Sequence, residues 1–361
     1  MLITLLFPAT LYAHRRPNYI AGAVTVMCAE TGLFLYGSNQ HRRHYPASLV
    51  KVMTALIVLE NVTDLEDIVY FSETAVTLPW YAANMGLREG DTLTVREALY
   101  GIMLPSANEV ANALAEYVAG DRASFLVMMN RRAYELGAFD THFVNACGLP
   151  GEGQHTTAYD MSLIMREAIT HPVFVEIINT AYFTFPPSRR HPEPRTLRNT
   201  NRLVREGDAL HNEWVVGGKT GWIIAARNTL TTYSVQDGRG IIVTVLYTDG
   251  AAATFEDTVS LLSHGFYLLA EIPLPEAELP VEEEVTAPPE AAIPVYLPAS
   301  PETEPIEPII IEETEPADVI SPMEQLRAFA WLITQILLII AAIIVAIVIY
   351  FHVCKQKPKG A

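Results

Sequence analysis

The chain has 361 residues, of which 41 are acidic and 24 are basic, and its net charge is −17. This acidity argues against nucleic acid as a partner, because phosphate neutralisation requires clustered Lys and Arg. Half of the residues are nevertheless hydrophobic and the mean hydropathy is +0.21, which suggests that charge and apolarity are segregated along the chain.

Metal and disulfide chemistry are not expected. The three cysteines, Cys28, Cys147 and Cys354, are too few and too scattered for a disulfide scaffold or a zinc site. Cys28 and Cys147 are expected to be buried free thiols. No two of the ten His residues have the spacing of a helical metal site. We therefore predict no metal, and the function predicted at the end of this section implies no organic cofactor.

The N-terminal residues 1–13, MLITLLFPATLYA, form an apolar stretch of the signal-peptide type. The basic region that normally opens such a peptide is absent, since the first basic residue is Arg15. We expect a truncated signal peptide with Ala13 as the cleavage point.

Residues 14–270 are expected to form one globular domain. Apolar residues alternate over Ala23–Tyr36 around Thr31-Gly32, which predicts a β-hairpin. The stretch that begins at Ala47 has the spacing and apolar density of a buried helix. Further helices are predicted over Val95–Ala119, Asp121–Leu136 and Tyr159–Thr170, with Gly120-Asp121 as stop and start signals.

The end of this domain returns to strand and helix patterns. Gly240–Tyr247 predicts a buried strand, and Thr258–Leu269 predicts a closing helix. Strands at both ends with helices between them favour an α/β sandwich, in which one sheet joins the two ends of the domain.

Residues 271–322 have a different composition. This segment holds 12 Pro and 14 acidic residues and no Lys or Arg. Proline removes backbone donors and like charges repel, so we predict a disordered linker. Its net charge of −14 accounts for most of the acidity of the chain, since residues 1–270 carry 20 basic and 26 acidic side chains.

A transmembrane helix is predicted over residues 326–353. Within it, Ala328–Val353 has no charged side chain and exceeds the ~20 residues that cross a hydrocarbon core. Three lysines lie in the short tail 354–361, and positive charge marks the cytoplasmic side. We expect a single-pass protein of the cell membrane, with its main domain outside and its C-terminus in the cytoplasm.

Three short motifs carry candidate chemistry. They occur in the order Ser48-Leu49-Val50-Lys51, Ser106-Ala107-Asn108 and Lys219-Thr220-Gly221. Ser-x-x-Lys, a Ser-x-Asn-like element and Lys-Thr-Gly form the signature of penicillin-binding proteins and class A β-lactamases. Each motif alone is weak evidence, but the ordered set is much rarer.

The use of lysine supports these motifs. Residues 1–270 contain 18 Arg but only two Lys, which are Lys51 and Lys219. Arginine stays protonated, whereas burial and neighbouring charge can convert a lysine amine into a base. The motifs therefore hold the two positions at which this domain uses lysine.

From residue 20 to about 268 the chain resembles the serine-type D-alanyl-D-alanine carboxypeptidases, the low-molecular-mass penicillin-binding proteins. Beyond the three motifs, the similar stretches are residues 28–56, 87–120, 141–165 and 197–204. The resemblance implies a β-lactamase/transpeptidase-like domain with an antiparallel sheet and a helical subdomain. It also implies removal of the terminal D-alanine from peptidoglycan stem peptides that end in D-Ala-D-Ala, with β-lactams as covalent inhibitors.

The same resemblance implies roles for the motif residues. Ser48 would be the nucleophile and Lys51 its general base, while Ser106 would relay a proton to the leaving amine. Asn108 would orient Lys51 and bind a substrate amide. Lys219, Thr220 and Gly221 would serve substrate binding: Lys219 would help to keep Lys51 neutral, and Thr220 would contact the substrate carboxylate. The backbone N–H groups of Ser48 and Trp222 would form the oxyanion hole.

The chain departs from the family pattern near the third motif. Ile223 and Arg227 stand where the family often has Thr and Gly. Thr254 stands where the family usually has an Arg that helps to hold the substrate carboxylate. Our hypothesis is that Arg227 partly substitutes for that Arg as a substrate-binding residue.

Two other functions stay open at this point. A non-catalytic wall-binding or β-lactam-sensing membrane protein would fit the altered positions. A class A β-lactamase would need a deacylating Glu, and Glu176-Ile177-Ile178-Asn179 lacks the required spacing. The prediction is a membrane-anchored carboxypeptidase whose partners are stem peptides, β-lactams and the lipid bilayer.

Overall fold

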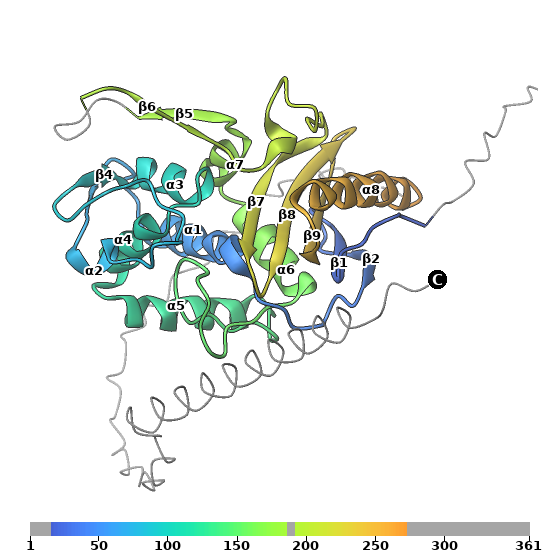
Figure 1. The fold of residues 1–361 in the computed structure, drawn as a ribbon. Coiled ribbons are helices and arrows are strands. Elements are labelled where there is room, and N and C mark those ends of the chain that lie inside the picture. The colour runs from blue at the N-terminus through green and yellow to red at the C-terminus, as the bar shows by residue number, and fades with distance from the viewer. Residues whose placement is uncertain (1–15, 186–191, 273–361) are drawn as a thin grey trace, which may run out of the picture. The chain divides into compact units, whose positions relative to one another are not determined.

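The computed structural model describes residues 16–185 and 192–272. A five-stranded antiparallel sheet with strand order β2-β1-β9-β8-β7 forms its centre (Figure 1). The strands are β1 (Ala23–Cys28), β2 (Phe34–Ser38), β7 (Val215–Ile223), β8 (Arg227–Gln236) and β9 (Arg239–Thr248). The predicted hairpin is β1 and β2, and the pairing of β1 with β9 joins the two ends of the domain as expected.

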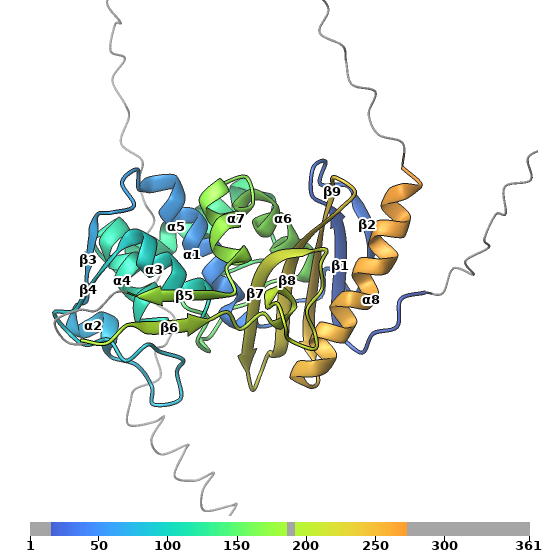
Figure 2. The same ribbon diagram turned by 90° about the horizontal axis from the view of Figure 1, so that it is seen from above.

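Both faces of the sheet are covered. Helix α8 (Ala251–Ala270) lies on one face and α6 (Ala158–Ala168) on the other (Figure 2). Strand β9 shows why, because its side chains alternate between two cores. Ile241, Val243 and Val245 pack with α8, whereas Ile242 and Leu246 pack with the helices of the opposite face. The predicted sandwich is therefore confirmed, with an antiparallel sheet.

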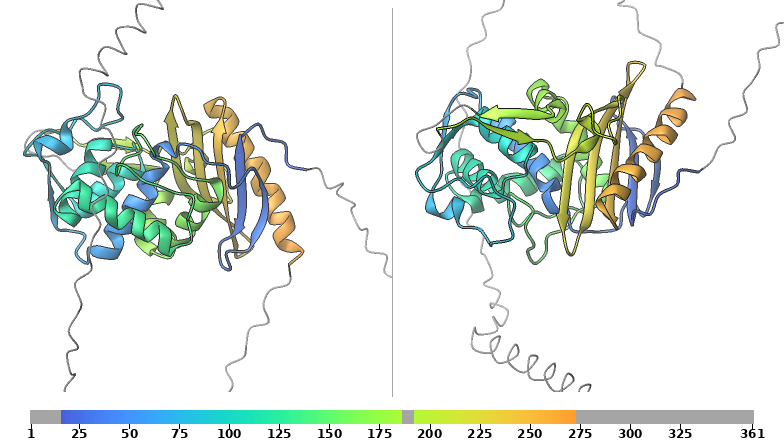
Figure 3. Two further views of the ribbon diagram at one scale, coloured as in Figure 1. Left: turned by 90° about the horizontal axis from the view of Figure 1, so that it is seen from below. Right: turned by 45° about the horizontal axis from the view of Figure 1, so that its top comes forward.

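The remaining helices gather on the α6 side of the sheet around α1 (Val50–Asn61), as Figure 3 shows. Helix α1 is buried on every side, since its residues Val50–Val58 are all buried, as expected of a helix at the centre of a core. The other helices are α2 (Glu73–Val76), α3 (Val95–Met103), α4 (Asn108–Ala119), α5 (Arg122–Glu135) and α7 (Pro172–Asn179). The described fold also contains two small antiparallel sheets of two strands each, β3 (Ile68–Tyr70) with β4 (Thr92–Thr94) and β5 (Tyr182–Phe185) with β6 (Arg195–Arg198).

The helix starts predicted from capping residues are confirmed. Asp121 caps α5, since its carboxylate accepts a hydrogen bond from Ser124 N at 2.9 Å. Asp160 lies in the first turn of α6, where the helix dipole favours negative charge. Helix α8 is longer than predicted, because it begins at Ala251 rather than Thr258.

The prediction of one helix over Val95–Ala119 is wrong. Helix α3 ends at Met103 and α4 begins at Asn108, and the second motif lies between them. Pro105 removes a backbone donor, and Ser106 has a φ of +69°, which no α-helix can include. The apolar spacing of the two helices concealed this break.

Strands β7 and β8 were not predicted. Gly217, Gly218 and Gly221 interrupt the apolar pattern of β7, and a strand of this kind has no clear period. These glycines reflect close packing instead: a Cβ on Gly218 would overlap the backbone of Thr231 on β8, and one on Gly217 would overlap Ile178.

Several predicted segments lie outside the described residues. They are the signal peptide at 1–13, the linker 271–322 from residue 273 onward, the transmembrane helix at 326–353 and the tail 354–361. Among the helices of residues 16–185 and 192–272, none has the length and apolarity that a membrane crossing requires.

Candidate active site

Ser48 lies in a 3₁₀ turn, Ala47–Leu49, that leads directly into α1. The preceding Ala47 has a φ of +49°, a conformation that costs an alanine about 1–2 kcal/mol. Strain of this kind is kept only where the surroundings impose it, and it concentrates at functional sites. The turn presents Ser48, which is partly exposed, to a pocket that it helps to line.

Two glycines hold this turn by close contact. Gly148 has a φ of +87°, and a Cβ at this position would overlap the carbonyl oxygen of Ala47 and lie 2.9 Å from Ser48 N. Gly221 on β7 approaches from the other side, where a Cβ would also lie 2.9 Å from Ser48 N. The backbone at the nucleophile is thus confined between the loop that precedes α6 and the edge strand of the sheet.

Lys51, the last residue of the first motif, has no exposed surface. Its Nζ donates hydrogen bonds to Ser48 Oγ at 3.2 Å, to Asn108 Oδ1 at 2.6 Å and to the Cys147 carbonyl at 2.5 Å. One residue of the first motif thereby joins α1, the start of α4 and the loop before α6. The arrangement aligns the amine with the hydroxyl that it would deprotonate.

Burial lowers the pKa of Lys51 to about 8, although the Cys147 thiol and the Glu109 carboxyl oppose this shift. A lysine with this pKa is partly neutral near physiological pH and can accept a proton. The pKa therefore suits a general base, which works best when its pKa lies near the operating pH.

The second motif adds two polar groups to the same place. Asn108 is buried at the first position of α4, and its side-chain oxygen accepts the Lys51 bond. Ser106 is also buried, and its Oγ has no hydrogen-bond partner within the described residues. Since an unpaired buried hydroxyl is costly, this oxygen is available for a substrate or a water molecule.

The third motif lies on β7. Lys219 is fully buried, and its Nζ donates to the Thr220 carbonyl at 2.7 Å. Burial, and after it the charge of Lys51, hold the pKa of Lys219 well below its usual range. The Thr220 hydroxyl donates a hydrogen bond to Thr200 Oγ1 at 2.7 Å, which links β7 to the segment that precedes it.

A cavity of about 720 Å³ brings the motifs together. Six of the nine predicted site residues line it, and Lys51 and Lys219 are fully buried. These six lining residues are Ser48, Ser106, Asn108, Thr220, Gly221 and Trp222. Trp222 is 63% exposed, and Trp80, which also lines the cavity, is 94% exposed, so aromatic side chains form part of its outer rim.

Arg227 has a different position from the one we expected. It is not among the described residues that line the cavity. Its guanidinium forms an ion pair with Asp249 and lies 4.3 Å from the centre of the Tyr247 ring. Thr254, which replaces the family arginine, does line the cavity and is 3% exposed. The hypothesis that Arg227 substitutes for that arginine therefore has no support in the geometry.

Three contributors to the site were not predicted. The Cys147 carbonyl binds Lys51, but a backbone group leaves no signal in the sequence. Glu109 is 1% exposed and accepts from Met85 N at 2.5 Å, and burial raises the pKa of its carboxyl. Arg202 lines the cavity. It lies in the family-like stretch 197–204, which could have drawn attention to it.

The described residues give no support to a deacylating Glu or to a metal site. Glu176 lies on α7, where its carboxylate accepts from Tyr100 Oη at 2.9 Å, and it is not among the described lining residues. Cys28 and Cys147 are buried free thiols, as predicted. The residues that the structure describes contain no group of three or more metal-ligating side chains able to hold an ion.

Comparison with known proteins gives one consistent result. The family model described as D-alanyl-D-alanine carboxypeptidase matches residues 11–250. The D-alanyl-D-alanine carboxypeptidase DacB2 of Mycobacterium tuberculosis is 32% identical over 246 residues, which are 66% of this chain and 80% of DacB2. DacD of Escherichia coli is 32% identical over 268 residues, and the match spans 70% of this chain but 65% of DacD.

Solved structures agree with these relatives. The crystal structure of the Streptomyces K15 DD-transpeptidase is 28% identical, with a TM-score of 0.64 over 70% of this chain and 99% of the other. A D-alanyl-D-alanine carboxypeptidase structure from M. tuberculosis is 29% identical, with a TM-score of 0.63 over 70% of this chain and 92% of the other. The antiparallel sheet with its helices is thus the fold of these enzymes.

The pKa of Lys51 predicts how the rate of Ser48 acylation depends on pH. The neutral fraction of Lys51 increases as the pH passes its pKa of about 8, so acylation by a β-lactam should rise between pH 7 and 9 and then level off. Stopped-flow acylation across this range measures the profile. Lys51→Arg is the control, because arginine stays protonated and should give slow, flat kinetics. A wild-type rate that still rises steeply above pH 10 would contradict the assignment.

The contact at Gly148 predicts a specific effect on the nucleophile. Gly148→Ala should displace the Ala47–Ser48 turn, and we expect a lower melting temperature and at least a roughly tenfold loss of acylation rate. Gly238→Ala is the matched control, since Gly238 has a similar φ of +77° but open space around it. That variant should lose only about 1–2 kcal/mol of stability. Equal acylation losses in both variants would refute the role of the close contact.

Proposed function

The chain belongs to the D-alanyl-D-alanine carboxypeptidase family, and we infer that it is a serine peptidase that removes the terminal D-alanine from peptidoglycan stem peptides. The observation that carries this inference is the hydrogen bond between the buried amine of Lys51 and the Oγ of Ser48, which lines the cavity. β-Lactams are expected to acylate the same serine, because they resemble the D-Ala-D-Ala end of the substrate.

The first half of the proposed reaction forms an acyl-enzyme. Ser48 Oγ attacks the carbonyl carbon of the penultimate D-alanine, and its proton passes to Lys51 Nζ. Backbone N–H groups of Ser48 and Trp222 stabilise the oxyanion, a contribution of ~10²–10³ in rate. The bond to the terminal D-alanine then breaks, and the leaving nitrogen takes up a proton through Ser106, whose hydroxyl is unpaired among the described residues.

The second half consumes water. A water molecule attacks the ester carbonyl, its proton passes to Lys51, and Ser48 leaves with a proton as the acid product is released. Asn108 keeps the amine in line through the 2.6 Å bond. Over both halves one peptide and one water give a shortened peptide and free D-alanine, so Ser48 and Lys51 return to their starting states.

The decisive experiment measures D-alanine release from a peptide that ends in D-Ala-D-Ala. The wild-type chain should release D-alanine and be labelled by a fluorescent penicillin, whereas Ser48→Ala should do neither. Labelling without release would instead indicate the β-lactam-sensing function. The absence of both in a folded wild-type protein would refute the carboxypeptidase and the sensor together.

We also propose that the enzyme is exported and held at the cell membrane by one helix, with its catalytic domain outside. The support comes from the sequence: an uncharged stretch at Ala328–Val353, lysines after it, and the acidic Pro-rich segment 271–322 that would act as a stalk. The apolar residues 1–13, which are of the signal-peptide type, would direct export.

Proteolysis tests the anchor and the stalk together. Limited digestion of membranes that contain the full chain should cut within residues 271–322 and release a soluble fragment that still frees D-alanine, because the described core closes with α8 before the segment begins. Undigested membranes washed with alkaline carbonate should retain the protein. Loss of the protein in that wash, or an inactive fragment, would contradict the proposal.

A further inference from the structure

Arg202 is the only charged side chain among the described residues that line the cavity. The two motif lysines are fully buried, and Arg227 is engaged by Asp249 outside the lining. A carboxypeptidase must recognise a free carboxylate one residue beyond the bond that it cuts. Burying that carboxylate in a cavity is costly unless a cation or several donors receive it. Arg202 is the group in the lining that could supply the charge.

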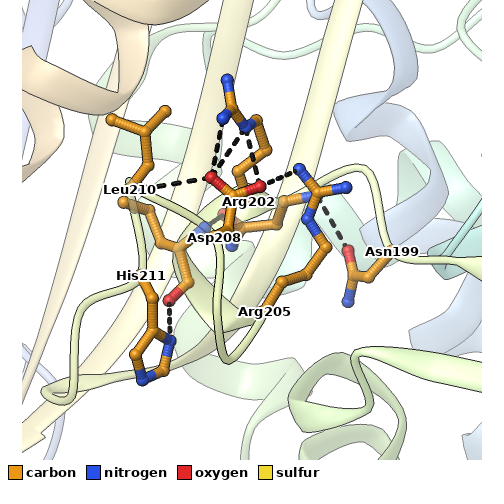
Figure 4. Close-up of polar contacts among 8 residues, drawn as sticks. Asn199, Arg202, Arg205, Asp208, Leu210 and His211 are labelled. Atoms are coloured by element: carbon orange, nitrogen blue, oxygen red, sulfur yellow. Dashed lines mark hydrogen bonds and ion pairs between the residues drawn. The ribbon is translucent and has the colours of Figure 1, made fainter.

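The Arg202 guanidinium is held in a fixed direction (Figure 4). Its Nε donates to both oxygens of Asp208 at 3.0 and 3.1 Å, and its Nη2 donates at 2.7 Å. The hydrogen bonds from Arg202 lower the pKa of Asp208 to about 2, so this carboxylate stays ionised at neutral pH. An arginine fixed along one edge loses little further freedom when its other edge binds a ligand.

Asp208 does not cancel the charge of Arg202, because it is shared. Arg205 Nη2 donates to Asp208 Oδ2 at 2.6 Å, and Leu210 N donates to Oδ1 at 3.1 Å. Two guanidinium groups face one carboxylate, which leaves the cluster with a net charge of +1. Arg205 is 7% exposed in its side chain, whereas Arg202 is 41% exposed, so the accessible part of this charge lies on Arg202.

One edge of Arg202 is free for a ligand. Arg202 Nε and Nη2 both donate hydrogen bonds to Asp208, whereas Nη1 donates none within the described residues. Arginine has five donors in a planar fork that matches a carboxylate. The Nη1 edge can therefore donate to a substrate while the contact with Asp208 is retained.

The position of Arg202 relative to the motifs fits this use. Thr200, two residues earlier, accepts the hydrogen bond of Thr220 Oγ1 at 2.7 Å, and its N–H donates to the Leu104 carbonyl at 3.1 Å. The segment that carries Arg202 is thereby tied to the third motif and to Leu104, two residues before the second motif. Arg202 itself opens a 3₁₀ turn, Arg202–Val204, that Asn201 caps. The backbone that carries Arg202 is thus fixed next to the third motif, and its side chain lines the cavity.

We propose that Arg202 binds the free terminal carboxylate of the D-Ala-D-Ala substrate and makes the enzyme selective for substrates that carry this charge. The proposal rests on the carboxypeptidase function inferred above and names a specificity residue for it. Thr254, which has no charge, lines the same cavity where the sequence pattern leads one to expect an arginine. Arg202 would supply that charge from a different element, the turn before β7 rather than α8.

The test compares two substrates on the full chain. They are an N-acylated peptide that ends in D-Ala-D-Ala and the same peptide with a terminal carboxamide, and the measured quantity is kcat/KM for release of the last residue. The wild type should prefer the acid. Arg202→Gln should lower kcat/KM on the acid roughly 10- to 100-fold, the value of one charged hydrogen bond. It should change kcat/KM on the amide by less than about threefold, and Arg202→Lys should keep part of the preference.

Arg205→Gln is the matched structural control, because it removes the other partner of Asp208 from a residue that is not in the described lining. It should lower the melting temperature. Because Asp208 would then face Arg202 alone, it should also reduce the ratio of acid to amide, but by much less than Arg202→Gln does. A ratio that falls equally in Arg205→Gln and Arg202→Gln would show a merely structural cluster and overturn the proposal. A ratio that collapses in Arg227→Gln instead would overturn it in favour of Arg227.

If Arg202→Gln fails to fold, the wild type alone still tests the proposal, because equal values of kcat/KM on the acid and the amide would refute it. Failure of the carboxypeptidase function is recognised separately. If neither peptide releases its last residue, acylation by benzylpenicillin and by its methyl ester gives the same comparison. A preference for the free carboxylate that Arg202→Gln removes would support Arg202 even then. Equal acylation, or none with either compound, would overturn the proposal.

Discussion

The burial of one lysine amine organises this domain. Lys51 has no exposed surface, and its Nζ bonds Ser48, Asn108 and the Cys147 carbonyl. A charged ammonium is very costly to bury, so the group either shifts its pKa or finds full hydrogen bonding. Here both occur, and the resulting base stands 3.2 Å from the hydroxyl that it activates. The surrounding fold serves to bring three distant segments to that nitrogen.

Close backbone packing completes the arrangement at some cost in local conformation. Ala47 and Ser106, one beside the nucleophile and one in the second motif, both adopt positive φ without being glycine. Gly148 and Gly221 leave no room for a side chain next to Ser48. Strained residues of this kind persist where the rest of the structure determines them. Helix α1 and the central sheet hold these residues in place, because both elements are packed among buried apolar side chains.

Sequence patterns predicted the elements that have a clear period or a capping residue. The β1–β2 hairpin, the buried helix after Ser48 and the start of α5 at Asp121 follow from such patterns. The errors occur near the motifs. The break at Leu104–Ala107 and the Gly-rich strand β7 carry the second and the third motif. Neither has a regular apolar period from which it could be predicted. Local propensity and global fold often disagree at functional sites.

The sequence by itself determined which residues are chemically special: three motifs in order, and a domain that uses lysine at Lys51 and Lys219 alone. Residue type and spacing are sufficient for that, because they record what a side chain can do. Only the tertiary structure decided which groups meet. It placed Arg227 on Asp249, Arg202 in the cavity and the Cys147 carbonyl on Lys51. These contacts join residues far apart in the chain, or use backbone atoms common to every residue, so their position is set by packing and leaves no local trace in the sequence.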